Sequence, residues 1–465
     1  MRRRCIAVAY ICAFVAGCAM EPRGATVVRP ASPPMALPTT WRIPRITRHT
    51  LPNGIQLWIV RSSRPLTSAY LSFPVGGRDV AASAAGLPYV LFDALANQVA
   101  ASGDMPFTAY ADALGARIGS STGPEQSGMT LVTQPFSMTE ALGLLSRTVK
   151  GEPGLSNSAF DESLARTKAK RARQASVDFL QGWAAGLQAI GFGGVSMPVY
   201  GTTSSLTKLT LEDALHMKRC KVRPEVARLF ISSSNDEDSV VAAATAAFGD
   251  WSPSPVGSDE CELAVPELTA TDPSLQGLRS VVVSSPQAKL VTIVIVAPGP
   301  VVGHRLAPSA EALANLLGER LGKKLTGESG MAYTTSGGLT WMGSRSVVMT
   351  MAVVAPERAQ EALAAMLEIW STFPGAVSDS EYAAAERAYL TAWISRVATS
   401  KDLITTLADY GSLDLKALDL TGAASDWKTL LRQPYAVALV GNEEGCVEAL
   451  KGVGAASPTT LHRLD

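Results

Sequence analysis

The feature that most constrains the fold of this chain is an internal repeat with an offset of about 222 residues. The apolar segment 68–75 aligns with 290–297, and both are rich in the β-branched or aromatic residues typical of strands. The helical pattern of 85–95 aligns with that of 307–317. Because these landmarks share one offset, we interpret the chain as one fold that occurs twice.

A third pair of segments supports the same offset. Segment 155–160 aligns with 377–382, and each offers a Ser or Asn cap ahead of a long helical pattern. Each repeat is predicted to run strand, helix, strands, helix, long helix pair and closing strand, with the closing strands at 227–232 and 436–440. We therefore predict an α+β fold of two tandem homologous sandwich domains, each a helical layer on one antiparallel sheet.

The 465 residues, 47% of them hydrophobic, suffice for two cores. Between the repeats lies a stretch rich in Pro, Ser and acidic residues without sustained periodicity, which indicates a linker. The predicted segments are a signal peptide at 1–17, a tether at 18–44, the N-terminal repeat at 45–251, the linker at 252–277 and the C-terminal repeat at 278–465.

The N-terminus predicts export. Arg2, Arg3 and Arg4 precede the apolar run 6–15, which is too short to span a bilayer permanently. The pattern resembles a bacterial lipoprotein signal, which implies acylation of Cys18; an ordinary secretory signal with a chance cysteine is the alternative. The resemblance implies an outer membrane lipoprotein facing the periplasm of a Gram-negative bacterium, or the cell surface, with membrane contact through the lipid anchor only.

The composition predicts neither a nucleic acid partner nor a cofactor. Forty-one basic residues balance forty-one acidic ones, so bulk charge does not attract nucleic acid. The Gly-rich run 191–194 lacks the Lys and the Ser or Thr of a phosphate loop. The four histidines are more than eighty residues apart in sequence, at His49, His216, His304 and His462.

Three cysteines remain after the predicted signal and Cys18: Cys220, Cys261 and Cys446. Their wide spacing excludes the local pairs of a zinc ribbon, and three thiols cannot all pair within one chain. One bridge would be compatible with the sequence, which does not identify the pair. The pattern favours buried free thiols.

A series of short motifs gives a family resemblance. In chain order they are Leu51-Pro52-Asn53-Gly54, Ala85-Gly86-Leu87, Leu114-Gly115-Ala116, Val199-Tyr200-Gly201-Thr202, Arg223-Pro224, Phe248-Gly249-Asp250-Trp251 and Gly330-Met331-Ala332-Tyr333. On these the chain resembles the insulinase (pitrilysin) family of metallopeptidases, which includes the mitochondrial processing peptidase and its non-catalytic relatives. The resemblance implies a metallohydrolase-like two-repeat fold of the processing-peptidase type.

The family carries its zinc on the first helix after Gly-Leu, in the inverted motif His-x-x-Glu-His. Two histidines bind the metal and the glutamate accepts a proton from metal-bound water. With Gly86-Leu87 in register, Tyr89, Phe92 and Asp93 occupy these positions. A phenol with an ordinary pKa near 10, a phenyl ring and one carboxylate cannot replace two imidazoles and a general base. We therefore predict that these degenerate zinc-motif positions hold no catalytic zinc.

The resemblance places the third zinc ligand, a glutamate, near Ala169. Segment 166–171 instead has four cations and no carboxylate, and positive charge repels a metal ion. Plain helix packing with a solvated or capped Asp93 is the favoured interpretation of the degenerate positions. The alternative is a repurposed pocket in which Tyr89 and Asp93, one helical turn apart, hydrogen-bond a ligand.

The second repeat of the family often contributes an Arg and Tyr pair that holds the substrate backbone. Here Tyr333 is retained as a substrate-binding remnant, but Thr326 occupies the arginine position. A lone tyrosine in such a segment is more often structural, so this alignment makes substrate clamping doubtful.

These observations predict a catalytically inactive insulinase-type peptidase homologue, lipid-anchored in the bacterial envelope. The resemblance implies a partner or substrate-binding subunit that pairs with an active zinc-peptidase homologue, or forms a homodimer, and helps to select unfolded peptides. Two alternatives stay open: a zinc metalloendopeptidase with atypical ligands, and an envelope scaffold lipoprotein.

Overall fold

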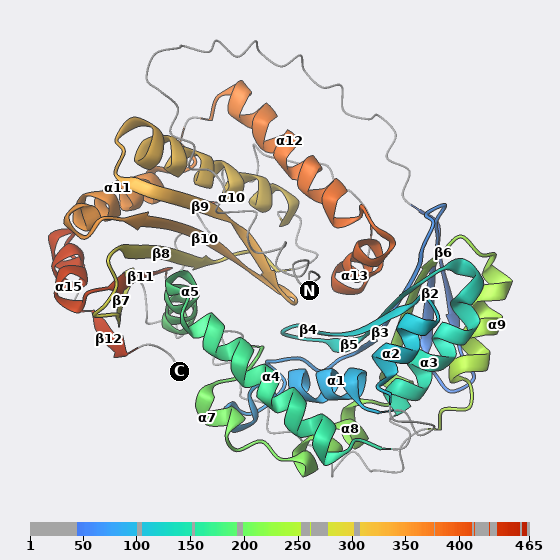
Figure 1. Cartoon of the computed structure of the whole chain (residues 1–465). Coiled ribbons are helices and arrows are strands. Elements are labelled where there is room, and N and C mark those ends of the chain that lie inside the picture. The colour runs from blue at the N-terminus through green and yellow to red at the C-terminus, as the bar shows by residue number, and fades with distance from the viewer. Residues whose placement is uncertain are drawn as a thin grey trace, which may run out of the picture. The chain divides into compact units, whose positions relative to one another are not determined.

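The structure is a computed structural model that describes residues 44–99, 105–150, 154–192, 199–252, 261, 278–301, 307–375, 377–411, 413, 427, 435–455 and 458–462 (Figure 1). The predicted signal peptide, Cys18 and the predicted tether up to residue 43 lie outside the described residues. Within the predicted linker, only Ser252 and Cys261 are described.

The first repeat is built on a six-stranded sheet with the order β1-β2-β6-β3-β5-β4. Its strands are β1 (Ile46–Thr50), β2 (Gln56–Arg61), β3 (Thr67–Phe73), β4 (Arg117–Thr122), β5 (Ser127–Thr133) and β6 (Arg228–Ser233). Its helices are α1 (Leu87–Asn97), α2 (Phe107–Ala113), α3 (Met138–Lys150), α4 (Asn157–Ala175), α5 (Asp178–Ala189), α7 (Thr203–Leu206), α8 (Leu211–Lys221) and α9 (Glu237–Phe248). Helices α1, α3, α8 and α9 share one hydrophobic core with this sheet.

The second repeat has a six-stranded sheet with the order β12-β7-β11-β8-β10-β9. Its strands are β7 (Leu278–Ser284), β8 (Val291–Pro298), β9 (Ala332–Met342), β10 (Arg345–Val354), β11 (Tyr435–Gly441) and β12 (Thr459–His462). Its helices are α10 (Ala307–Gly322), α11 (Ala359–Thr372), α12 (Asp379–Arg396), α13 (Ser400–Tyr410) and α15 (Glu443–Gly452). A short π-helix, Lys323–Glu328, follows α10.

The two sheets confirm the predicted α+β fold of two similar units. Each long helix begins at a serine cap, Ser156 for α4 and Ser378 for α12, and these lie 222 positions apart in the sequence. Most strand pairs are antiparallel as predicted, but the sheets are mixed, because β2 pairs parallel with β6 and β7 pairs parallel with β11 and β12. The closing strand of each repeat inserts between two strands of opposite direction, so it must run parallel to one of them.

One helix of each repeat packs on the sheet of the other repeat. Helix α5 packs on β8 and β11 of the second sheet, and α13 packs on β3 and β6 of the first (Figure 1). Gly182 and Gly186 permit the close approach of α5, because a Cβ there would lie 2.9 Å from Val294 Cγ2 and 2.8 Å from Val296 Cγ2 respectively. Every residue of strands β3 and β8 is buried, as expected for strands that are covered on both faces. Among the described helices, none combines the length and apolar content needed to cross a bilayer.

Candidate functional site

The helix that aligns with the zinc helix, α1, begins where the predicted motif places it. Gly86 caps the helix with a φ of 90°, and Pro88 lies in its first turn. A Cβ on Gly86 would lie 3.0 Å from the Cα of Gly201, so the loop before α7 approaches the helix closely. The hydroxyl of Ser205 donates a hydrogen bond of 2.8 Å to the carbonyl oxygen of Ala85. The Tyr200-Gly201-Thr202 motif thus supports the start of α1.

Phe92 occupies the position of the family's glutamate and belongs to the core. Its side chain is fully buried, and its ring stacks on that of Phe73 with centroids 5.7 Å apart. Val90, Leu91 and Leu95 of the same helix are buried in the same cluster. A phenyl ring in this environment can neither bind a metal ion nor accept a proton.

Asp93, at the position of the second histidine, forms an ion pair with Arg166 of α4. The Nε and Nη2 of Arg166 donate to Asp93 Oδ2 at 3.0 Å and 2.8 Å, and Asp93 is only 8% exposed. Ser163, one turn earlier on α4, donates a hydrogen bond of 2.9 Å to the carbonyl oxygen of Val90. The interpretation of Asp93 as solvated or capped is therefore wrong: its carboxylate is paired across two packed helices.

Tyr89, at the position of the first histidine, contacts Lys170 of α4 and Tyr200. The Lys170 ammonium donates a hydrogen bond to the Tyr89 hydroxyl and lies 4.8 Å from the ring centroid. The Tyr89 and Tyr200 rings meet edge to face with centroids 4.6 Å apart. Burial, with a smaller contribution from the Asp93 charge, raises the pKa of Tyr89 to about 12. The phenol therefore stays protonated at neutral pH and is a poor metal ligand.

The α4 residues that meet the degenerate motif are Arg166 and Lys170. They lie four positions apart on one helix face, whereas Ala169, where the resemblance placed the third ligand, is exposed. Counting along the sequence thus located the correct turn of α4 but not the residues that face α1. We call Tyr89, Asp93, Arg166 and Lys170 the ion-pair cluster; it offers two cations, one neutral phenol and one paired carboxylate.

This donor set does not fit a catalytic zinc ion. Zinc in such a site needs three ligands such as imidazole or carboxylate and an open position for water. The one carboxylate, Asp93, already pairs with a guanidinium, and the two cations would repel the ion. Within the described ranges, no three His, Cys, Asp or Glu side chains lie close enough together to hold a metal ion.

Tyr333, the predicted substrate-binding remnant, lies near the start of β9 and is 68% exposed. Thr326, at the arginine position, lies in the exposed π-helix before that strand. Within the described part of the chain, Tyr333 makes no hydrogen bond, ion pair or ring contact, whether with Tyr89, Phe92 or Asp93 or with any other residue.

The second repeat has an ion pair between the equivalent helices, α10 and α12, that the sequence analysis missed. Glu311 of α10 lies 222 positions after Tyr89, and its carboxylate accepts hydrogen bonds from Arg396 of α12. Glu311 is 5% exposed. The burial of Tyr389, with a smaller contribution from the Glu311 charge, raises the pKa of Tyr389 to about 12. Applying the 222-residue offset to the motif itself would have identified this residue.

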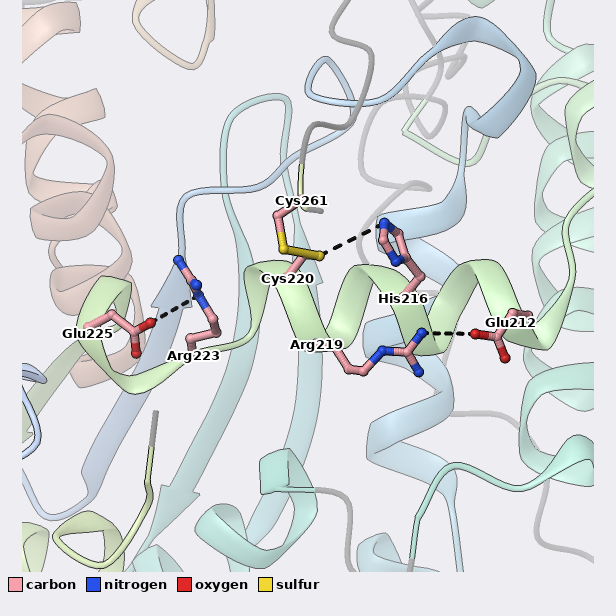
Figure 2. Close-up of a disulfide and its surroundings, with 7 residues drawn as sticks. All are labelled: Glu212, His216, Arg219, Cys220, Arg223, Glu225 and Cys261. Atoms are coloured by element: carbon pink, nitrogen blue, oxygen red, sulfur yellow. Dashed lines mark hydrogen bonds and ion pairs between the residues drawn. A yellow bond between two sulfur atoms is a disulfide. The ribbon is translucent and has the colours of Figure 1, made fainter. Parts of the chain in front are cut away.

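The cysteines differ from the favoured prediction of free thiols. Cys220 at the end of α8 forms a disulfide with Cys261 (Figure 2). That prediction is therefore wrong for these two residues, because sequence spacing carries no information on which helix turn meets the linker. Cys446 is a buried free thiol, and burial raises its pKa to about 12.

Comparisons with known proteins identify the fold and one family domain. Residues 208–389 match the family model described as the peptidase M16 inactive domain. No curated protein matches this sequence. Two solved structures resemble it with TM-scores of 0.70: a protease from Helicobacter pylori, 19% identical over 86% of this chain and 100% of that one, and a peptidase M16 inactive domain from Pseudomonas fluorescens, 15% identical over 85% and 98%.

A third similar structure is a chain of complex III2 from Candida albicans with Inz-5 bound. It is 16% identical, covers 88% of this chain and 99% of its own, and has a TM-score of 0.69. At these identities the likeness shows the fold alone, while the family model adds a domain assignment. The chain therefore shares the fold of these solved structures, and its residues 208–389 match the peptidase M16 inactive domain, in agreement with the resemblance that the motif series predicted.

Proposed function

We propose that this chain is a catalytically inactive M16 peptidase homologue, lipid-anchored in the bacterial envelope, that serves as the partner or substrate-binding subunit of an active zinc peptidase. The ion-pair cluster carries the first part of the proposal. Where the family has two histidines, a glutamate and a further glutamate, α1 and α4 bring together Asp93 with Arg166 and Tyr89 with Lys170. These pairs engage Asp93 Oδ2 and the Tyr89 hydroxyl.

The sheet edge supports peptide binding without cleavage. Strand β4, which packs against α1, is at the edge of the first sheet and pairs only with β5 among the described residues. An extended peptide can add to such an edge through main-chain hydrogen bonds, which need no catalytic group. The exposed Tyr333 is a candidate contact for such a peptide from the second repeat.

Two observations support the envelope location. The N-terminal pattern ending at Cys18 resembles a lipoprotein signal. The Cys220–Cys261 disulfide is of the kind that forms in oxidising compartments such as the bacterial periplasm.

A metal and cleavage assay tests the loss of catalysis. Purified protein incubated with one equivalent of zinc and then dialysed should retain far less than one zinc per chain and show no chelator-sensitive cleavage of unfolded peptides, because the ion-pair cluster lacks a ligand set. The matched variant is Asp93→Asn, which removes the charge of the one carboxylate present. Stoichiometric zinc that is lost in Asp93→Asn, together with cleavage, would establish the atypical zinc endopeptidase instead.

Fractionation with capture tests the anchor and the partner in one experiment. Wild-type protein should sediment with outer membranes and, after detergent extraction, co-purify with a homologue that carries His-x-x-Glu-His. The control Cys18→Ser should remain in the soluble fraction, because it lacks the acylated residue. A soluble wild-type protein would contradict the anchor. Recovery of envelope proteins without any peptidase homologue, from a chain that is monomeric by mass, would favour the scaffold alternative.

A further inference from the structure

The disulfide fastens the predicted inter-repeat linker to the first repeat. Cys220 lies in the last turn of α8, whereas Cys261 lies within the segment 252–277 that connects the repeats. The connection between the repeats runs from Trp251 to Leu278, the first residue of β7. The bond divides it at Cys261 and holds that point on α8 (Figure 2).

The two sulfur atoms have different surroundings. Cys220 is 2% exposed and Cys261 is 9% exposed, so Cys261 is the more accessible residue of the pair. His216, one turn before Cys220 on α8, places its Nε2 3.9 Å from the Cys220 Sγ. Figure 2 shows His216 on the same side of α8 as the disulfide, while Arg219 and Glu212 pair with each other on the other side.

This asymmetry defines a direction for thiol–disulfide exchange. A thiolate attacks one sulfur and expels the other as a thiolate, and expulsion is faster when the leaving thiolate is stabilised. A nearby histidine N–H is one of the groups that stabilise a cysteine thiolate. Exposure favours attack at Cys261, and the His216 contact favours departure of Cys220.

We propose that the Cys220–Cys261 bond is a redox-sensitive clasp on the inter-repeat linker, opened by attack of a small thiol at Cys261 with Cys220 as the leaving group held by His216. In the first step a bond forms between the thiol sulfur and Cys261 Sγ, and the electron pair of the broken bond goes to Cys220 Sγ. A second thiol then releases Cys261, so that two thiols are oxidised to one disulfide and the clasp takes up two electrons and two protons. Cys261 is then no longer bonded to α8.

Trapping the intermediate tests the direction of attack. The full-length protein is exposed briefly to reduced glutathione, quenched with an alkylating reagent and digested with trypsin. The sequence contains no Lys or Arg between Arg228 and Arg279, so the peptide that holds Cys261 is separate from Cys220. We expect glutathione on Cys261 and the alkyl group on Cys220; glutathione on Cys220 would overturn the proposal.

Variants of His216 test its role. His216→Phe keeps a ring but removes the N–H, and it should slow glutathione reduction of the bond about tenfold, as expected for a lost hydrogen bond to a charged group. The matched control is Glu212→Gln, which changes a charge on the same helix away from the sulfur atoms and should leave the rate unchanged. Equal rates for wild type and His216→Phe would exclude the assigned role of His216.

Protease cleavage beside Cys261 measures the release of this position from α8, independently of the role of His216. Glu260 and Glu262 flank Cys261, so a glutamate-specific protease reports access to this point. Cleavage there should be at least several-fold faster after reduction of the wild type, and in Cys261→Ser it should be fast with or without reductant. Reduction without any change in cleavage would show that the bond does not hold the linker.

Discussion

Restoring the family's glutamate through Phe92→Glu should destabilise the first repeat by at least about 4 kcal/mol, because removing a buried phenyl ring alone costs about 3 to 5 kcal/mol and the new carboxyl would be buried without a partner. Phe92 is fully buried and stacked on Phe73, in the largest cluster of the repeat. Urea unfolding followed by circular dichroism measures the loss as a lower midpoint of the transition that reports this repeat.

Two controls distinguish a buried charge from a simple loss of volume. Phe92→Leu should cost only about 1 kcal/mol, because an apolar side chain is kept. In Phe92→Glu, burial raises the pKa of the carboxyl above its ordinary value of about 4.3, so the folded state binds more protons than the unfolded one and stability falls further as the pH rises above that value. A Phe92→Glu protein as stable as Phe92→Leu at pH 7 would contradict the assignment of this helix to the core.

The expected loss of stability in Phe92→Glu shows that the degenerate motif has a structural role in addition to lacking zinc ligands. In an active site the glutamate needs water beside it, whereas here the same helix position supports the packing of α1 on the sheet. The neighbouring polar positions are paired with Arg166 and Lys170 of α4. Regaining zinc binding would therefore require changes on both helices and new space between them.

The repeat could be predicted from the sequence because apolar strands and helix caps recur at fixed positions, and the caps at Ser156 and Ser378 are present as expected. The α4 residues that pair with the degenerate motif could not be predicted from the sequence. Counting residues along α4 identifies the helical turn but not which side chains on that turn face α1. The exchange of α5 and α13 between the repeats was also missed. Its signal was the largely apolar sequence of β8, which is typical of a strand covered on both faces; β3, with Thr67, Ser68 and Ser72, gives a weaker signal.

Helices α9 and α15, which follow the closing strands, were missed as well. The sequence of α9 is rich in alanine, and its apolar face is narrow, so periodicity alone gives a weak signal. Its start is nevertheless marked by Asp236, whose side chain accepts a hydrogen bond from the Ser239 amide at 2.8 Å. The second such cap, Asn442 before α15, lies after the second closing strand in the same way.

Replacing both disulfide cysteines by serine should lower the stability of the first repeat by about 4 kcal/mol, because the bond closes a loop with a sequence separation of 41 residues and thereby restricts the unfolded chain. The effect should be measured as a fall in the unfolding midpoint of Cys220→Ser/Cys261→Ser relative to oxidised wild type. Both cysteines are buried, so the new hydroxyls add a smaller cost in the same direction.

Reductant separates the cross-link from the side-chain change. Treating wild type with a strong reductant should bring its midpoint close to that of the double variant, while the midpoint of the double variant should not move. Cys446 is a buried thiol in the second repeat, so it contributes equally with and without reductant. If the reduced wild type unfolds at the same urea concentration as the oxidised protein, the bond does not restrict the unfolded chain. Reduction of the Cys220–Cys261 bond should both lower the urea unfolding midpoint and speed protease cleavage beside Cys261. The two effects should therefore appear over the same range of thiol concentration.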